Sequence, residues 1–264
     1  MATYEEISFR TLDGLTLRGS LYCAGLNSSA VIITPGFNVT RDVLLPRIAR
    51  HFQLSGITAL VYDHRSVARI TFWGFSFGGA VALNAAALDK RAKAVIAVCP
   101  LTQWNLDTGK WRRVMEKAMQ DRESRLCGNT PFSLPMITES GVNPAGFSSG
   151  IGASELSLVA EAKKIPGFNL HTTIQTYYNI MAWSPFKLLE YIAPTPVLVV
   201  SPEDDRISPL ADQKELIYDK VTGPKRMHVV PKKGHMDILD GDSFEAVMAV
   251  QVDFIRESFD ADVA

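Results

Sequence analysis

Short runs of hydrophobic residues, separated by segments of helical character, follow one another along this chain of 264 residues. Hydrophobic and polar positions alternate over Glu6–Arg10 and again over Leu15–Tyr22, and the Asp13-Gly14 pair between them predicts a β-hairpin. Runs without alternation are typical of central strands that are covered on both faces. We therefore predict further strands at residues 30–34, 57–62, 69–73, 92–98, 195–200 and 226–230.

Helical segments separate several of these strands. Thr40 is a suitable N-cap for a helix that ends near Leu54, and Pro46 within it predicts a kink or a late start. The alanine-rich stretch from Ser76 to Leu88 favours a helix, and an amphipathic pattern predicts another at 243–259. Buried strands that alternate with helices indicate an α/β fold with a mostly parallel, doubly wound sheet.

Residues 101–183 interrupt this alternation. Helical patterns at 110–125, 153–164 and 172–182 flank a loop rich in Gly, Pro and Ser at 129–152. We interpret the segment as a helical cap or lid, inserted into a sheet core that comprises residues 1–100 and 184–264. Its aromatic side chains either line an apolar pocket or form the core of the insertion itself; they are Trp104, Trp111, Phe132, Phe168, Tyr177, Tyr178 and Trp183.

One predicted connection is too short. Only about five residues, 63–67, separate the strands predicted at 57–62 and 69–73. Parallel strands of one sheet need a crossover of about a dozen residues or more, which is usually a helix. Either the two strands form an antiparallel hairpin, or a crossover helix is missing between Ser66 and Val67.

Composition narrows the class of function. Lysine and arginine number 27 against 28 acidic residues, a balance that argues against nucleic-acid binding. Cys23, Cys99 and Cys127 are widely spaced, so they indicate neither a disulfide framework nor a metal knuckle. Neither a signal peptide nor a membrane-spanning stretch is visible, and we expect a cytoplasmic protein that acts on a small molecule without a cofactor.

The segment Gly74-Phe-Ser-Phe-Gly-Gly79 follows a predicted buried strand and opens a predicted helix. This is the context of a nucleophile elbow, in which small residues allow the sharp turn that exposes the serine, here Ser76. The segment 146–150 also has the pattern Gly-x-Ser-x-Gly, but no strand precedes it. We therefore expect Ser148 to be a loop serine of the insertion.

A serine nucleophile needs a base, and the base needs an acid that orients it. His235 lies in a loop just beyond the last predicted strand, where functional groups of open α/β sheets gather, and His64 is the runner-up. The remaining histidines are expected in helices (His51, His171) or within a strand (His228).

The acid is expected in an acidic turn that follows the strand at 195–200. Glu203, Asp204 and Asp205 all lie there, and the order Ser76, Asp205, His235 is that of an α/β-hydrolase triad. The oxyanion of acyl transfer needs two backbone N–H donors, which we assign to Phe77 and Phe37. Neither a metal-binding motif nor a phosphate loop is present.

The chain resembles the fungal polyketide transferase and thiohydrolase group of the α/β-hydrolase superfamily, a group related to dienelactone-hydrolase-like proteins. The resemblance lies in four stretches, at residues 61–66, 72–79, 86–95 and 183–186. The resemblance implies a helical lid, Ser76 as nucleophile and His235 as base. It implies Asp205 as acid, because this residue lies four positions before Pro209, with Asp204 as the alternative. Members of the group release or move acyl chains held as carrier-protein thioesters.

The sequence departs from this resemblance between Ser66 and Val67, where relatives carry a loop and a helix of about thirty residues. We expect a serine hydrolase that cleaves an acyl ester or thioester, with the substrate either free or bound to a carrier protein. An acyltransferase with the same triad and a non-catalytic binding protein on the same scaffold are the alternatives. The sequence does not decide the substrate or the oligomeric state.

Overall fold

The computed structural model describes residues 4–10, 16–34, 44–62, 70–102, 107–147 and 151–260. It divides into two compact units. The core unit comprises Met1–Leu101 and Pro185–Ala264, and the inserted unit comprises Thr102–Ser184.

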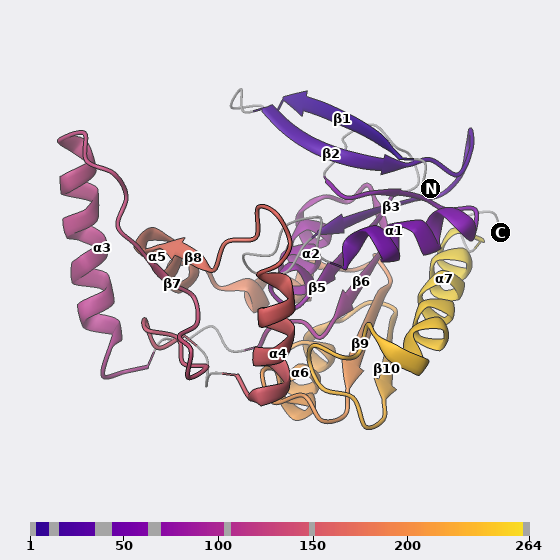
Figure 1. Cartoon of the computed structure of the whole chain (residues 1–264). Helices are drawn as coiled ribbons and strands as arrows, with labels where there is room; N and C mark the ends of the chain where they lie inside the picture. The colour runs from indigo at the N-terminus through magenta and orange to yellow at the C-terminus, as the bar shows by residue number, and fades with distance from the viewer. Residues whose placement is uncertain are drawn as a thin grey trace. The chain divides into compact units, whose positions relative to one another are not determined.

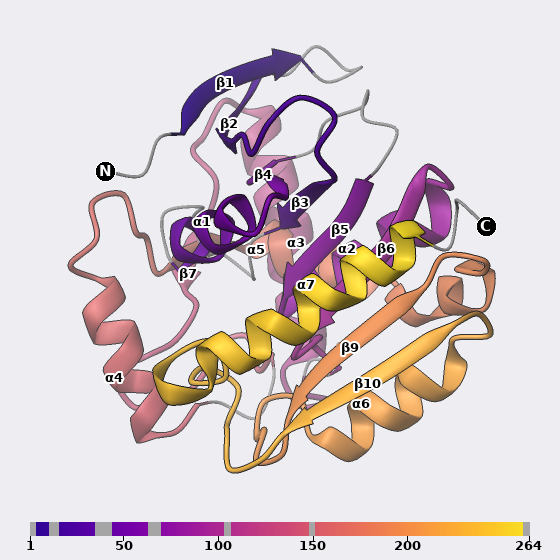
Figure 2. The same cartoon turned by 90° about the vertical axis from the view of Figure 1, so that its right-hand side faces the viewer.

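An eight-stranded sheet forms the centre of the core unit, with the strand order β1-β2-β4-β3-β5-β6-β9-β10 (Figures 1 and 2). Strand β2 runs antiparallel to β1 and to β4, and all other neighbours in the sheet are parallel. This mostly parallel arrangement confirms the predicted fold class. The strands are β1 (Glu5–Arg10), β2 (Thr16–Tyr22), β3 (Ala30–Thr34), β4 (Thr58–Leu60), β5 (Ile70–Phe75), β6 (Ala92–Val98), β9 (Val197–Pro202) and β10 (Lys225–Val230).

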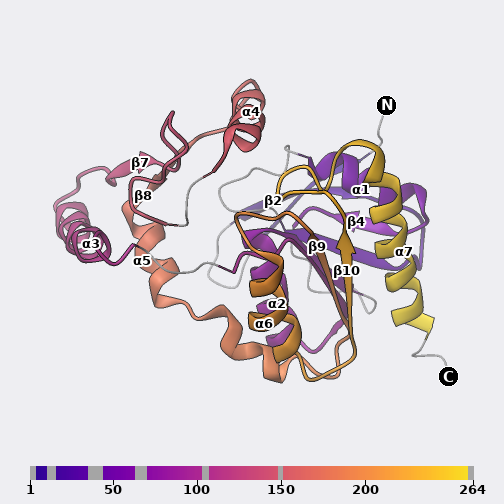
Figure 3. The same cartoon turned by 90° about the horizontal axis from the view of Figure 1, so that it is seen from below.

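Helices cover both faces of this sheet, as Figure 3 shows. Helices α1 (Leu45–Leu54) and α7 (Phe244–Asp260) pack on one face, and α2 (Phe77–Leu88) and α6 (Leu210–Leu216) pack on the other. The short 3-10 helix η1 (Pro185–Tyr191) adds to the second face, whereas η2 (Tyr218–Lys220) and η3 (Gly241–Ser243) lie in connections. The central strands β5 and β9 are buried throughout, as their uninterrupted hydrophobic runs predict.

Helix α1 begins late. It starts at Leu45, and Pro46 occupies its first turn, where the missing N–H of proline costs no helical hydrogen bond. The alternative of a late start, rather than a kink, is therefore the one that the structure adopts. The predicted cap Thr40 lies outside the described residues.

The short connection joins two strands that lie on either side of β3. Both β4 and β5 pair with β3 in parallel, so the hairpin alternative for these two strands is wrong. Because β4 ends at Leu60 and β5 begins at Ile70, nine residues are available, not five. An extended chain of that length reaches about 30 Å, whereas two strand spacings and the height of one strand need about 20 Å. Nine residues fall short of what a crossover helix with its loops requires.

The described residues of the inserted unit, 107–147 and 151–184, form three helices and a small two-stranded sheet. The helices are α3 (Trp111–Leu126), α4 (Ala153–Ala162) and α5 (Ile174–Ala182), and β7 (Ser133–Pro135) pairs antiparallel with β8 (His171–Thr173). The helix predicted to start at residue 172 therefore starts two residues later, and His171 lies in a strand and not in a helix. Strand β7 begins directly after Phe132, whose backbone N–H is bonded to Asp121.

Helices α3 and α5 are joined through a buried carboxylate. Asp121 accepts hydrogen bonds from the backbone N–H of Phe132 at 2.6 Å and from the side-chain amide of Gln175 at 3.0 Å. The Phe132 N–H contributes most to lowering the pKa of Asp121 below its ordinary value. Tyr177 is fully buried nearby and belongs to the core of this unit, whereas Trp111 and Phe132 are exposed.

Across the part of the chain that the structure describes, no helix is both long and apolar enough to cross a bilayer.

Candidate active site

Four neighbouring strands of the core unit each deliver one polar side chain beyond their carboxyl ends. Ser76 follows β5, Cys99 follows β6, Asp205 comes after β9 and His235 comes after β10. Because these strands are parallel and adjacent, their carboxyl ends meet at one edge of the sheet. The structure thereby brings together Ser76, Asp205 and His235, which lie up to 159 positions apart in the sequence.

Ser76 occupies a strained turn between β5 and α2. Its φ angle is 55°, a value that non-glycine residues rarely adopt. Gly74 allows the turn, because a Cβ atom at this position would lie 1.9 Å from the carbonyl oxygen of Gly78. The Ser76 amide donates to the carbonyl of Val98 at 2.9 Å, which ties the turn to β6. The side chain is half-buried and stands directly before the first turn of α2.

His235 lies between the serine and an aspartate. Its Nε2 atom is 2.8 Å from Ser76 Oγ, and its Nδ1 atom is 2.8 Å from Asp205 Oδ2. A carboxylate can only accept, so Nδ1 carries the proton and Nε2 accepts the hydrogen bond of the serine hydroxyl. The ring is almost completely buried and packs against Phe75, with the two ring centroids 5.4 Å apart.

The carboxylate of Asp205 is held by four donors. Oδ1 accepts from the backbone N–H groups of Ile207 at 2.9 Å and Ser208 at 2.8 Å. Oδ2 accepts from His235 Nδ1 and from the side-chain amide of Gln213, the latter at 3.2 Å. An ionised carboxylate offers about four lone-pair sites, and here each has a donor.

The other two acids of this turn face elsewhere. Asp204 is exposed, and its backbone N–H donates to the carbonyl of Lys233 at 2.8 Å. Glu203 is also exposed, and its carboxylate accepts from the backbone N–H of Lys232 at 3.0 Å. Both contacts join the turn after β9 to the loop that carries His235, so the two acids help to set the distance between the loops.

Cys99 is a neighbour of this site that sequence reasoning did not single out. Its thiol donates a weak hydrogen bond to the backbone carbonyl of His235 at 3.7 Å, and the residue has a positive φ of 45°. Burial raises the pKa of this thiol well above its ordinary value, and the charges of Asp205 and Asp237 raise it further. No sequence signal marks the residue, because Cys99 approaches His235 only through the order of β6, β9 and β10.

The ligand-type atoms of Cys99, Asp205 and His235 lie within 4.8 Å of one another. A cysteine binds a metal ion as the thiolate, and the burial of Cys99 favours the protonated form. His235 Nδ1 is already bonded to Asp205, so a metal ion would have to replace the proton between them. The geometry suits proton transfer better than metal coordination.

Several predicted residues lie elsewhere or cannot be described. Phe77 is the first residue of α2, so its backbone N–H lies at the amino end of that helix, directly after Ser76. Phe37, His64 and Ser148 lie outside the described residues. The remaining histidines lie in regular elements: His51 is in α1, His171 in β8 and His228 in β10.

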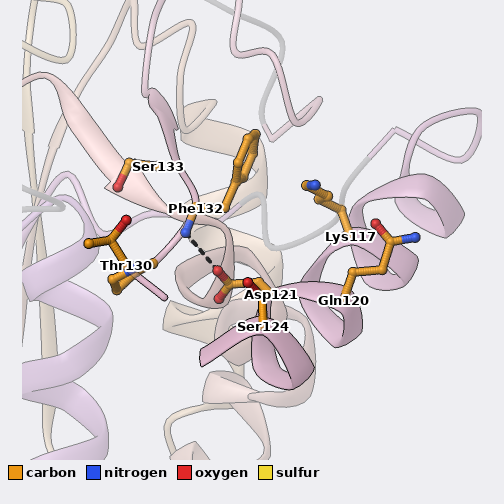
Figure 4. A pocket seen from close by; sticks show the side chains of 8 residues that line it. Lys117, Gln120, Asp121, Ser124, Thr130, Phe132 and Ser133 are labelled. Carbon is orange, nitrogen blue, oxygen red and sulfur yellow. Dashed lines mark hydrogen bonds between the residues drawn. The ribbon is translucent and has the colours of Figure 1, made fainter. Parts of the chain in front are cut away.

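A pocket of about 320 Å³ lies in the inserted unit, between α3 and the segment that enters β7 (Figure 4). Lys117, Asp121 and Phe132 line it, and the bond between Asp121 and the Phe132 amide crosses its floor. The Lys117 ammonium lies 4.6 Å from the centre of the Phe132 ring. None of the residues that line this pocket belongs to the site on the sheet edge.

Comparison with known proteins identifies the family. Residues 57–242 match the family model described as the alpha/beta hydrolase fold. A thiohydrolase of Eupenicillium brefeldianum is 40% identical, with 97% of this chain and 95% of the relative covered. A polyketide transferase of Penicillium crustosum is 36% identical, with 98% of both proteins covered. The first alignment extends over 293 positions, which is longer than this chain, so the relative contains residues that have no counterpart here.

A solved structure leads to the same family. The crystal structure of the α/β hydrolase GrgF from Penicillium sp. sh18 superposes with a TM-score of 0.87 at 35% sequence identity, and 97% of this chain and 99% of that chain are covered. The strand order of the core unit and the turn after β5 agree with such a fold. The chain belongs to the α/β-hydrolase fold family, and it is a relative of fungal thiohydrolases and polyketide transferases.

Proposed function

We propose that the protein is a serine hydrolase that cleaves acyl esters or thioesters, with Ser76 as nucleophile, His235 as general base and Asp205 as the acid that orients it. The observation that carries the proposal is the continuous chain of hydrogen bonds from Ser76 Oγ through both ring nitrogens of His235 to Asp205, each 2.8 Å long. A serine becomes a competent nucleophile when a neutral imidazole accepts its proton and a carboxylate fixes the tautomer.

The reaction proceeds in two halves. Ser76 Oγ attacks the acyl carbonyl carbon while its proton passes to His235 Nε2, and a tetrahedral oxyanion forms. The oxyanion collapses, the bond to the thiolate or alcohol breaks, and His235 gives its proton to that leaving group. An acceptor, either water or the hydroxyl or amine of a second substrate, then attacks the acyl-enzyme with His235 again as base, which releases the product and restores Ser76.

Backbone N–H groups stabilise the oxyanion in this proposal. The Phe77 N–H follows the nucleophile directly and lies in the first turn of α2, where the helix dipole favours negative charge. The second donor is the N–H of Phe37, in the segment that follows β3. Strand β3 is the immediate neighbour of β5 in the sheet, which supports this assignment.

Ser76, and not Cys99, is the nucleophile in this proposal. The Ser76 hydroxyl is half-buried and bonded to His235 Nε2, whereas the Cys99 thiol is fully buried and bonded to a backbone carbonyl. A cysteine reacts as its thiolate, and the raised pKa of Cys99 keeps its thiol protonated. Cys99 thus contacts the backbone of the His235 loop through its thiol.

The names of the relatives support the class of substrate. One relative is called a thiohydrolase and another a polyketide transferase, so we propose an acyl chain of polyketide type, held as a thioester on a small thiol or on a carrier protein. We also propose that the inserted unit, Thr102–Ser184, is a lid domain, in keeping with its insertion between β6 and β9. Release to water makes the protein a hydrolase, and transfer to an alcohol or amine makes it an acyltransferase.

A fluorophosphonate probe tests the assignment of the nucleophile. Folded protein should be labelled at Ser76, as peptide mass spectrometry would show, and Ser76→Ala should abolish both labelling and turnover. Ser148→Ala is the matched control, because the same short pattern surrounds this serine, and it should retain both. If the wild-type protein folds but is neither labelled nor active on ester and thioester substrates, the alternative of a non-catalytic binding protein holds.

Product analysis separates hydrolysis from transfer. An acyl N-acetylcysteamine thioester would be incubated with and without a nucleophilic alcohol, and the products would be quantified by mass spectrometry. A hydrolase yields the free acid in both reactions. An acyltransferase yields mainly the ester when the alcohol is present, even though water is in large excess.

A further inference from the structure

A buried amide on α6 completes the hydrogen bonding of the triad acid. Gln213 has no exposed surface, and its Nε2 atom lies 3.2 Å from Asp205 Oδ2. The same oxygen accepts the hydrogen bond from His235 Nδ1. The same Nε2 group donates to the backbone carbonyl of Ser208 at 2.5 Å. One amide thus holds the carboxylate and the turn that carries it.

A second buried side chain fixes the orientation of this amide. The hydroxyl of Ser201, which is fully buried in β9, donates to Gln213 Oε1 at 2.7 Å. In the flipped orientation, Oε1 would face both a carboxylate oxygen of Asp205 and the carbonyl oxygen of Ser208, and three acceptors would meet without a proton. Only the observed orientation satisfies every partner.

We propose that Gln213, held by Ser201, is a positioning residue of the catalytic reaction: its amide keeps the Asp205 carboxylate aligned with His235 Nδ1. This inference rests on the proposed function. Without the amide, Oδ2 keeps one donor, and the carboxyl plane is free to rotate about the bonds that Oδ1 makes to the Ile207 and Ser208 amides. The imidazole would then spend less time with Nε2 directed at Ser76.

The amide also shapes the charge that His235 experiences. Each N–H that points at the carboxylate takes up part of its negative charge, so loss of the Gln213 bond leaves more of that charge to stabilise the imidazolium. Among the described residues, two further ionisable groups near the pair are Cys99, which burial keeps protonated, and Asp237, whose carboxylate accepts from the Gly234 amide at 2.7 Å. Substitution of Gln213 leaves both in place.

The first test is Gln213→Leu, assayed by steady-state hydrolysis of a p-nitrophenyl ester. We expect kcat to fall by about tenfold or more, as for the loss of one hydrogen bond to a charged group, with KM nearly unchanged. The acid limb of the kcat/KM profile should move to higher pH, because the imidazolium is stabilised. Gln251→Leu is the matched control: Gln251 is equally buried but bonds Trp73 on the opposite face of the sheet, so it should lose stability without losing kcat.

Gln213→Glu provides a sharper signature. Two carboxyl groups about 3 Å apart share one proton, since both cannot ionise together. The protonated form still donates to Asp205, so activity should persist just above the acid limb of the profile and fall as the pair loses its proton. A purely structural role for Gln213 would not produce this additional basic limb.

If Gln213→Leu does not fold, Ser201→Ala decides the question, since it removes only the hydroxyl that orients the amide. A fall in kcat of about threefold or more, with a shifted pH profile, supports the inference. Wild-type kcat and pH profile in a folded Gln213→Leu or Ser201→Ala variant would overturn it. Such a result would leave the proposed function intact, because labelling of Ser76 and the inactivity of Ser76→Ala test that function separately.

Discussion

Replacement of Asp205 by asparagine tests the triad acid. The variant keeps the shape of the side chain but exchanges one oxygen for an NH2 group. All four partners of Asp205 are donors, at distances of 2.8, 2.8, 2.9 and 3.2 Å. Whichever oxygen is exchanged, the NH2 group meets two N–H groups that it cannot satisfy.

Both orientations of the new amide disturb the site. With NH2 toward His235, the ring must present Nδ1 as an acceptor, so Nε2 carries the proton and cannot act as base toward Ser76. With NH2 toward the Ile207 and Ser208 amides, the turn after β9 must move. We expect kcat to fall about 10⁴-fold, the size seen when the histidine of a triad is held in the wrong tautomer. The free energy of unfolding should fall by about 3–6 kcal/mol, for two lost hydrogen bonds to a charged group.

Asp204→Asn is the matched control for this experiment. Asp204 is the adjacent residue, is exposed, and contributes its backbone N–H to the contact with Lys233, so the substitution leaves that contact in place. Ester hydrolysis and chemical denaturation would be measured for both variants. The reasoning is refuted if Asp205→Asn stays within about tenfold of wild-type kcat, or if Asp204→Asn is the inactive variant.

Three further outcomes follow from the packing. Gly74→Ala places its Cβ against the Gly78 carbonyl, so we expect the free energy of unfolding, measured by chemical denaturation, to fall by about 3 kcal/mol or more. A variant as stable as the wild type would contradict the turn geometry. The pKa of Asp121 is lowered in the folded protein, so its contribution to stability is present above the unfolded-state pKa of about 4 and is lost as the pH falls through the lower folded-state pKa. Asp121→Asn should therefore reduce the melting temperature at neutral pH, and the difference from wild type should shrink on acidification. Iodoacetamide should alkylate the two exposed cysteines of the native protein but reach Cys99 only after denaturation, and inactivation by alkylation at Cys99 in folded protein would argue against serine as nucleophile.

The main elements of the core unit were predictable because their local signals agree with their environment. Uninterrupted hydrophobic runs became the buried strands β3, β5, β6 and β9, and the alanine-rich stretch after Ser76 became α2. Ser76 itself stood out because a strand, a turn and a helix follow one another around it. This context, and not the short pattern alone, separated it from the second Gly-x-Ser-x-Gly segment at 146–150.

Features that depend on tertiary contacts were not accessible in the same way. Asp204 and Asp205 are neighbours in one turn, and only the loop geometry decides which carboxylate faces His235. Gln213 lies in a seven-residue helix with no distinctive pattern, and its role depends on a buried contact across the turn. The connection after β4 appeared as a possible hairpin because spacing alone does not say that β3 lies between the two strands.

The sheet order also places the side chains of the site on one side of the seam between β3 and β5. The three hydrogen-bonded residues of the proposed triad follow strands on one side of that seam, in the half formed by β5, β6, β9 and β10. The same holds for Gln213 and Cys99. The other half, β1-β2-β4-β3, shares the β3–β5 border with it, and in the proposed mechanism it supplies a backbone group, the N–H of Phe37. The short connection that leaves β4 therefore belongs to the half of the sheet that supplies no side chain to the hydrogen-bonded chain from Ser76 to Asp205.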